Sequence, residues 1–214
     1  MKNIAKYIDH TCLKPDAIEN EIKNLCTEAI DYEFASVCIN PLYVPLAVKH
    51  LKGKDPKVCS VIGFPLGSIS TEMKFAEAML AIHQGVDELD MVINIGNLKQ
   101  GNFREINNEV SKIVRASADI VIKVIIETCL LNDKEIVKIS KLIKNSGADF
   151  VKTSTGFSHG GATVEDIRLI RESVGSNFGV KASGGISTLL DLNNMINAGA
   201  NRIGTSSGVK ILNE

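Results

Sequence analysis

Short apolar runs alternate with longer segments in which apolar residues recur every three or four positions. Most of the short runs are rich in Val and Ile and lack a polar face, which predicts parallel strands covered on both sides. The longer segments predict amphipathic helices. We expect eight strands, at Tyr7–Asp9, Ala35–Ile39, Lys57–Ile62, Glu88–Ile93, Ile120–Ile126, Phe150–Thr153, Gly179–Ala182 and Arg202–Gly204.

Three of the predicted helices carry signals at both ends. A capping residue opens each one, namely Asn132 with Glu135 three positions later, Thr163 with Asp166, and Ser70 or Thr71. A glycine follows each helix, at Gly147, Gly175 and Gly85 respectively. We expect the buried faces to be formed by Ile136, Ile139 and Ile143, by Ile167, Ile170 and Val174, and by Met73, Ala76 and Leu80.

One short pattern recurs where a predicted helix passes into a predicted strand, as Gly85-Val86-Asp87, Gly147-Ala148-Asp149 and Gly199-Ala200-Asn201. Three copies of one helix-to-strand turn indicate a repeated βα unit. Eight such units in about 200–250 residues make a minimal (β/α)8 barrel. A doubly wound sheet is the alternative, but it normally has a glycine-rich fingerprint after its first strand, which this sequence lacks. We therefore expect an α/β protein with the TIM-barrel fold, as a single domain over residues 1–214.

Composition and charge narrow the class of protein. The 214 residues include 24 basic and 25 acidic side chains, so a net charge of −1 gives no electrostatic footprint for nucleic acid or an acidic membrane. The five cysteines lie far apart, which argues against a disulfide framework and a structural zinc site. No apolar stretch is long enough for a signal peptide or a membrane span. We expect a cytoplasmic protein.

Polar side chains gather at or near the predicted carboxyl ends of the strands, where barrel enzymes place their active sites. They are Asp9, Cys38, Asn40, Asp90, Glu127, Thr128, Lys152, Thr153, Thr155, Lys181, Ser183, Thr205, Ser206 and Ser207. This edge of the barrel is therefore the expected site of chemistry.

Two lysines, Lys152 and Lys181, lie inside otherwise apolar strands. Structural salt bridges, or stems that reach the barrel mouth, would explain them, but a buried lysine commonly has a task. Close ammonium groups disfavour each other's protonation, and a neutral amine is the nucleophile that Schiff-base chemistry requires. The pair therefore predicts one nucleophile and one neighbour that favours its neutral form. Lys123 lies in another strand, with no partner evident from the sequence.

The last two strands end in Ser183-Gly184-Gly185 and Gly204-Thr205-Ser206-Ser207-Gly208. Barrels frequently bind a phosphate group with these two loops, although glycines that merely form turns are the simpler alternative. The four histidines, His10, His50, His83 and His159, lack metal-ligand spacing and are expected to be structural or on the surface. We expect no metal site.

The sequence resembles the deoxyribose-phosphate aldolases, which are class I, lysine-dependent aldolases. The resemblance covers nearly the whole chain. It rests on Ile8-Asp9-His10-Thr11, Ser36-Val37-Cys38-Ile39, Glu88-Leu89-Asp90-Met91-Val92-Ile93-Asn94, Val151-Lys152-Thr153-Ser154-Thr155-Gly156-Phe157, Val180-Lys181-Ala182-Ser183-Gly184-Gly185-Ile186 and Gly204-Thr205-Ser206-Ser207-Gly208.

The resemblance implies that Lys152 forms the Schiff base, that Asp90 donates and accepts the proton, and that Lys181 is the second lysine of the relay. It also implies a substrate site formed or supported by Asp9, Cys38, Thr153 and Thr155, and a phosphate site at Gly184, Gly185, Gly204, Ser206 and Ser207. The family cleaves 2-deoxy-D-ribose 5-phosphate reversibly into D-glyceraldehyde 3-phosphate and acetaldehyde, needs no cofactor, and often forms homodimers.

The sequence differs from many members of this family at its carboxyl end. Many members end in a flexible tail with a terminal tyrosine, whereas this sequence ends in Ile211-Leu212-Asn213-Glu214. We therefore expect any proton transfer that the tail assists to be slower here or to pass through water.

Two other functions fit parts of the pattern. A lysine-dependent barrel aldolase with a ketone donor would differ in a donor pocket that the sequence does not define. A sugar-phosphate binding protein on a degraded barrel would lack Lys152, Lys181 or Asp90, and all three are present.

Overall fold

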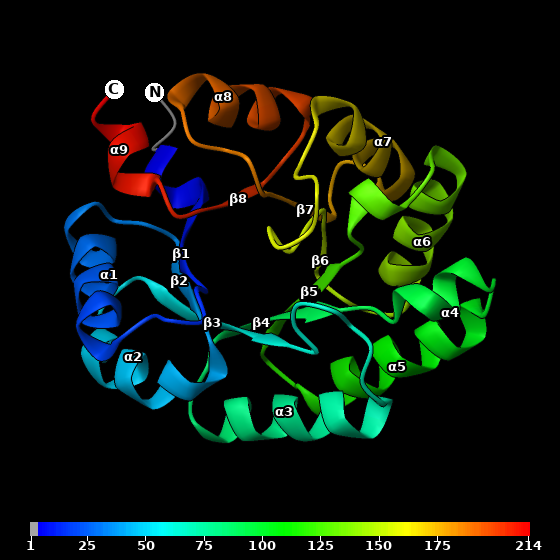
Figure 1. Cartoon of the computed structure of the whole chain (residues 1–214), viewed down its shortest axis with the longest axis horizontal. Coiled ribbons are helices and arrows are strands. Elements are labelled where there is room, and N and C mark those ends of the chain that lie inside the picture. The colour runs from blue at the N-terminus through cyan, green and yellow to red at the C-terminus, as the bar shows by residue number, and fades with distance from the viewer. Residues whose placement is uncertain (1–3) are drawn as a thin grey trace.

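A closed barrel of eight parallel strands forms the centre of the molecule (Figure 1). The computed structural model describes residues 4–214, so residues 1–3 of the predicted domain lie outside the described part. The strands follow each other in sequence order, and β1 pairs with β8 to close the barrel. They are β1 (Ile8–Cys12), β2 (Ser36–Ile39), β3 (Lys57–Ile62), β4 (Glu88–Val92), β5 (Val121–Ile125), β6 (Phe150–Lys152), β7 (Gly179–Ser183) and β8 (Arg202–Thr205).

Helices surround the barrel on its outer side (Figure 1). They are α1 (Glu19–Asp31), α2 (Val44–Leu51), α3 (Thr71–His83), α4 (Ile95–Lys99), α5 (Phe103–Ala116), α6 (Asp133–Asn145), α7 (Val164–Val174), α8 (Leu189–Ala198) and α9 (Gly208–Leu212). Short 3-10 turns lie at Ile4–Tyr7, Pro41–Tyr43 and Thr128–Leu130. Within residues 4–214, no helix is long and apolar enough to cross a membrane.

The structure confirms the TIM barrel and every predicted strand, with one boundary that matters for the site. We predicted that the first strand ends at Asp9, but β1 continues to Cys12. Asp9 pairs with Ser36 of β2 and Gly204 of β8 in the middle of the barrel wall. The polar run Asp9-His10-Thr11 looked like a strand end because the sequence does not show that a barrel interior can contain charged groups.

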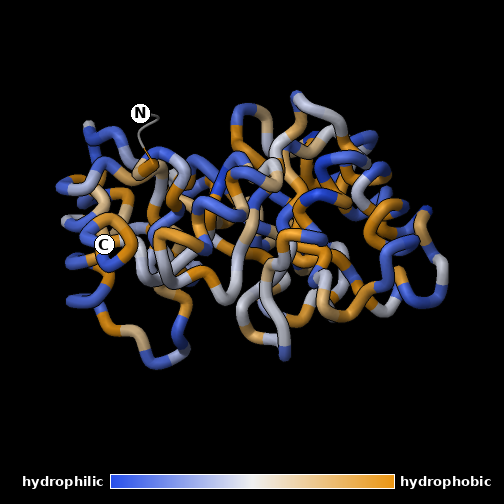
Figure 2. The backbone as a smooth tube through the Cα atoms, turned by 90° about the horizontal axis from the view of Figure 1, so that it is seen from above, coloured by the Kyte–Doolittle hydropathy of each residue, from blue (hydrophilic) through white to orange (hydrophobic). Residues whose placement is uncertain are grey.

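The helices pack on the barrel through the apolar faces that their periodicity predicts. Hydrophobic and hydrophilic residues alternate along the helical parts of the backbone (Figure 2). On α6, Ile136, Ile139 and Ile143 are all buried, and the side chains of Asn132 and Glu135 form the predicted capping box. The same agreement holds for α7, whose N-cap is Thr163 and whose C-cap is Gly175.

Helix α3 is an exception, because its observed buried face differs from the predicted one. Met73 and Leu80 are 56% and 57% exposed, and Ala76 is exposed too. The helix instead buries Lys74, Ala78 and Ala81. Small alanine side chains let the helix approach the barrel closely, and Lys74 finds a buried partner, so the prediction from apolar spacing was wrong here.

The repeated helix-to-strand turn has a role that its sequence did not reveal. The third residue of each copy accepts a hydrogen bond from a backbone N–H of the preceding strand. Asp87 binds Val58 at 2.8 Å, Asp149 binds Ile122 at 2.8 Å and Asn201 binds Val180 at 3.0 Å. The glycine that begins each copy has a positive φ, so the chain can turn back into the barrel. The repeat therefore ties neighbouring βα units together.

Candidate active site

A pocket of about 510 Å³ opens at the carboxyl ends of the strands. Its wall comes from β1 and the loop after it, from α1, and from the loops that follow β6, β7 and β8. The lining residues that the sequence singled out are Lys152, Thr155, Ser183, Gly184, Gly185, Gly204, Thr205 and Ser206. The pocket therefore joins the predicted lysine site to the predicted phosphate loops.

Lys152 and Lys181 lie side by side on β6 and β7, where they form a register pair. Residues that pair in register on parallel strands point to the same side of the sheet, so both side chains enter the barrel. The carboxylate of Asp90 lies between them. Its Oδ2 atom is 2.8 Å from Lys152 Nζ and 2.7 Å from Lys181 Nζ. The three side chains named from the sequence therefore form one contact group.

Asp90 also binds a third lysine, which the sequence left without a partner. Its Oδ1 atom is 2.9 Å from Lys123 Nζ and accepts a hydrogen bond from Cys59 at 3.2 Å. Burial alone would raise the pKa of Asp90, but Lys123, Lys152 and Lys181 hold it well below its usual range. Asp90 is therefore a buried carboxylate that stays ionised at neutral pH.

The three lysines differ in how many carboxylates they contact. Lys181 contacts Asp90 and, at 2.5 Å, Asp9, while Lys123 contacts Asp90 and, at 2.6 Å, Glu88. Burial would lower the pKa of Lys181, but its two carboxylates raise it above its ordinary value. Lys181 therefore stays charged beside Lys152. Among residues 4–214, Lys152 has Asp90 as its single carboxylate contact, so it is the amine whose proton is least compensated.

Asp9, Cys38 and Thr153 do not line the pocket, although the resemblance placed them at the substrate site. Asp9 is completely buried and contacts Lys181 and Arg202. Cys38 is completely buried, with its sulfur 3.9 Å from Asp90. The hydroxyl of Thr153 accepts a hydrogen bond from the Ser183 backbone N–H. Asp9 and Cys38 lie on strands β1 and β2, and Thr153 lies directly after β6, so these buried residues support the pocket from below.

Thr155 does line the pocket, and a buried glutamate fixes its position. Glu127 accepts hydrogen bonds from the backbone N–H of Thr155 at 3.1 Å and from its hydroxyl at 2.5 Å. The Thr155 hydroxyl in turn accepts a bond from the Phe157 N–H. Glu127 adopts a left-handed conformation with φ of 55°, which turns its side chain back toward this loop. The segment after Lys152 is thereby held in one shape.

The predicted phosphate loops lie on one side of the pocket. Gly184, Gly185, Gly204 and Ser206 line it, whereas Ser207 does not. Gly184 has a packing reason for being glycine, because a Cβ there would lie 2.9 Å from Gly161 Cα. At Gly185, with φ of +79°, a Cβ would meet no atom within 4 Å. Open space beside bare backbone is what an anion needs, so Gly185 fits the predicted role better than Gly184.

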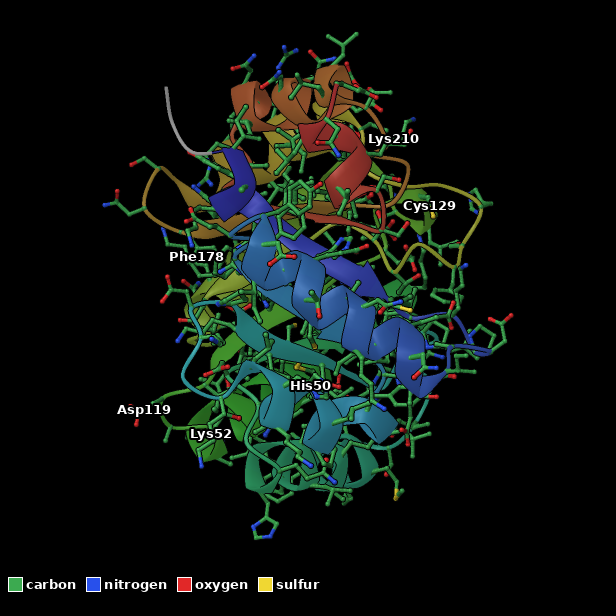
Figure 3. The ribbon with its side chains drawn as sticks, turned by 90° about the vertical axis from the view of Figure 1, so that its left-hand side faces the viewer. His50, Lys52, Asp119, Cys129, Phe178 and Lys210 are labelled. Atoms are coloured by element: carbon green, nitrogen blue, oxygen red, sulfur yellow. The ribbon has the colours of Figure 1, made fainter. Side chains whose placement is uncertain are left out.

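The sequence missed several groups of the pocket wall. Lys14 is an exposed cation of this wall, and Phe157 packs edge-on against Phe64 at the rim. His10 Nε2 lies 2.6 Å from Glu28, so this histidine is structural as predicted but also lines the pocket. Their spacing along the chain carries no signal, since loop conformation alone brings them to the mouth. The other three histidines are exposed, and Figure 3 shows His50 on α2, outside the barrel.

One group of described residues has atoms close enough to share a metal ion, namely Cys38, Cys59 and Asp90, whose ligand atoms lie within 4.8 Å of one another. Both oxygens of Asp90 already contact ammonium groups. A cation added there would face three lysines. We therefore interpret these residues as part of the ion-pair network.

Comparisons with known proteins agree with this site. Residues 3–214 match the model of the DeoC/LacD family aldolases. The chain is 56% identical to a deoxyribose-phosphate aldolase of Caldanaerobacter subterraneus subsp. tengcongensis, over 100% of this chain and 94% of that protein. Among solved structures, an aldolase called QR15 superposes with a TM-score of 0.95 at 44% identity, over 100% of this chain and 96% of that one.

A tetrameric deoxyribose phosphate aldolase from Aeropyrum pernix is also similar, with a TM-score of 0.92 at 37% identity, over 98% of this chain and 89% of that one. Both the sequence match and the structural match extend over essentially the whole barrel. This chain therefore belongs to the DeoC/LacD family of aldolases.

Proposed function

We propose that this chain cleaves 2-deoxy-D-ribose 5-phosphate reversibly into D-glyceraldehyde 3-phosphate and acetaldehyde, through a Schiff base on Lys152. The observation that carries the proposal is that Lys152 alone of the three Asp90-bound lysines lines the pocket. The deoxyribose-phosphate aldolase names of the curated relatives support the substrate.

The first half of the reaction forms a covalent intermediate. The neutral amine of Lys152 attacks the C1 aldehyde of the open-chain sugar, and loss of water from the carbinolamine leaves an iminium ion. Asp90 lies 2.8 Å from the Lys152 nitrogen, where it stabilises this cation. The ion pairs with Lys123 and Lys181 keep that carboxylate ionised and fixed in place.

The second half breaks the carbon–carbon bond. The Asp90 carboxylate accepts the C3 hydroxyl proton through a water, while Lys181, which is already protonated, holds that carboxylate in position. The C2–C3 electrons move toward the iminium, and glyceraldehyde 3-phosphate leaves. The remaining enamine takes a proton at C2 and is then hydrolysed to acetaldehyde and free Lys152. The phosphate of the substrate lies on the backbone at Gly185 and Ser206, beside Gly184 and Gly204.

Borohydride trapping tests the covalent step. Acetaldehyde with borohydride should add an ethyl group to Lys152, which peptide mass spectrometry can locate. A coupled assay should show acetaldehyde release that is insensitive to EDTA, because we expect no metal to take part. An adduct on Lys181 with Lys152 untouched would reverse the two assignments. EDTA-sensitive cleavage without any adduct would refute the Schiff base.

A second substrate tests the phosphate site. Ser206→Glu puts a carboxylate at the pocket wall and should reduce activity on the phosphorylated sugar far more than on 2-deoxyribose. Equal losses on both sugars would show that this loop does not bind the phosphate.

We also propose that the protein forms a homodimer and is cytoplasmic. The apolar side of α3 and the loop before it supports the dimer, since Leu66, Ile69, Met73 and Leu80 are 37% to 72% exposed. Sedimentation analysis of Met73→Glu/Leu80→Glu should then show a smaller species than the native protein. A monomeric native protein would refute the dimer.

A further inference from the structure

We propose that Glu88 and Arg202, at the amino ends of β4 and β8, set the charge state of Lys152 without touching it. The inference rests on the proposed function, in which neutral Lys152 is the nucleophile. It concerns two residues that lie on the side of the barrel opposite the pocket mouth.

Six charged side chains form a closed ring inside the barrel. Starting at Asp90, the contacts run to Lys181 at 2.7 Å, to Asp9 at 2.5 Å and to Arg202 at 2.5 Å. From Arg202 they continue to Glu88 at 3.1 Å, to Lys123 at 2.6 Å and back to Asp90 at 2.9 Å. We call this set the charge ring.

The charge ring is balanced, because its three carboxylates alternate with three cations. Lys152 contacts the ring at Asp90 and is not part of the cycle. A proton on Lys152 therefore adds one uncompensated positive charge to a buried, neutral assembly. Asp9, Asp90, Lys123 and Lys181 all have 0% exposure, so solvent screens this charge poorly.

The ring holds nearly all the charge that faces Lys152. The eight strands contain only three other acidic or basic residues. They are Lys152 itself, the exposed Lys57, and His10, which pairs with Glu28. The remaining titratable groups around Lys152 are the thiols of Cys38 on β2 and Cys59 on β3, Glu127 after β5, and Cys12, Lys14, Glu21 and Glu28 at the pocket. None of these groups is a member of the ring.

The contacts within the ring favour the charged forms of Asp9 and Arg202. Burial would raise the pKa of Asp9, but Lys181 and Arg202 hold it below its ordinary value. Burial would lower the pKa of Arg202, but Asp9 and Glu88 raise it. Removing one charge from either end of the Glu88–Arg202 pair therefore leaves the ring with a net charge that Lys152 must face.

Opposite charge changes in this one ion pair should move the enzyme in opposite directions. Glu88→Gln leaves the ring positive, which disfavours a proton on Lys152, so the acid limb of the kcat/KM profile should move to lower pH. Arg202→Gln leaves the ring negative and should move the limb to higher pH. We expect shifts of about one pH unit for one charge at an effective dielectric constant near 20.

Two matched variants separate charge from packing. The double variant Glu88→Gln/Arg202→Gln restores a neutral ring, so its acid limb should return to the native position even if its rate is lower. Arg202→Lys keeps the charge and should also keep the native limb. A loss of packing would instead lower the rate at every pH and would be larger in the double variant.

The measurements are the pH dependence of acetaldehyde release and of borohydride adduct on Lys152, with folding checked by circular dichroism. Limbs that stay fixed, or that move the same way in both single variants, would overturn the inference. If Glu88→Gln does not fold, the test is the comparison of Arg202→Gln with Arg202→Lys. Acid limbs at the same pH in these two variants would overturn the inference. Native protein with neither acetaldehyde release nor adduct would instead refute the proposed function.

Discussion

The molecule buries lysines in two regions that look alike by exposure and differ in chemistry. One region is the barrel interior around Asp90, and the other lies between α3 and α5, where Lys74 is 0% exposed. Lys74 Nζ is 2.8 Å from Glu109 and donates to the Val92 carbonyl at 2.8 Å. The pocket at the carboxyl ends of the strands is lined by Lys152 of the first region and by neither Lys74 nor Glu109.

The number of opposite charges around each group explains the contrast. Burial lowers the pKa of Lys74 and raises that of Glu109, because a single ion pair does not outweigh the loss of hydration. In the barrel, the pKa of Lys181 rises and that of Asp90 falls despite burial, because each contacts more than one opposite charge. A buried lysine is thus a catalytic candidate when it is accessible and its charge is uncompensated.

Replacing the two lysines by methionine should separate the regions most strongly. Lys152→Met removes the nucleophile and should reduce the cleavage rate by about 10⁴-fold or more, with little loss of stability. Lys74→Met should leave the rate within a few-fold of native below its unfolding temperature. The coupled assay and thermal unfolding measure both quantities. Comparable rate losses in the two variants would refute the distinction.

Lys181→Leu should have the next largest effect, a fall in turnover of about 10³-fold at pH 7. It removes the cation that holds Asp90 and Asp9 in place, whereas the phosphate loops stay intact. Competition by inorganic phosphate should therefore change little. Unchanged activity at neutral pH would remove Lys181 from the mechanism.

The free energy of unfolding should depend more on the Lys74 region than on Lys152, which is the reverse of the order expected for the cleavage rate. Lys74→Met leaves the Glu109 carboxyl buried without its cation and should lower the free energy of unfolding by about 3 kcal/mol. Lys74→Met/Glu109→Leu should recover part of this loss, since an apolar pair carries no unpaired charge. Denaturant titration measures both values. A double variant less stable than the single one would contradict this interpretation.

The smallest expected effect is on stability in acid. The pKa values of Asp9 and Asp90 are depressed in the folded protein, so their contribution is present above the unfolded pKa of about 3.9 and is lost as the pH falls. We expect the free energy of unfolding to drop by about 1.5 kcal/mol between pH 5 and 3.5.

Glu109→Gln provides the matched control for the acid effect. The pKa of Glu109 is raised in the folded protein, so this group loses no stabilising contribution on acidification. Because the folded protein binds a proton at Glu109 more readily than the unfolded chain does, this group adds stability as the pH falls. The variant lacks that gain, so its acid-dependent loss should be at least as large as that of the native protein. If the free energy of unfolding of Glu109→Gln did not fall with pH, the acid effect would come from Glu109 and not from Asp9 and Asp90.

The sequence by itself determined the barrel. Val- and Ile-rich runs, helix caps such as Asn132 with Glu135, and the repeated glycine turn are local features, and each depends on residues a few positions apart. The same local reading identified Lys152 and Lys181, because a charge in an apolar strand stands out without any knowledge of its neighbours.

Tertiary structure alone decided which charges meet. Lys181 and Asp90 are 91 residues apart, and Arg202 and Asp9 are 193 residues apart, so closure of the barrel sets these contacts. It also placed Asp9 and Cys38 beneath the pocket, gave Lys123 its partners, and turned Lys74 of α3 inward. Sequence periodicity shows which side chains share a face, but electrostatic balance depends on distances between strands, which exist only in the closed barrel.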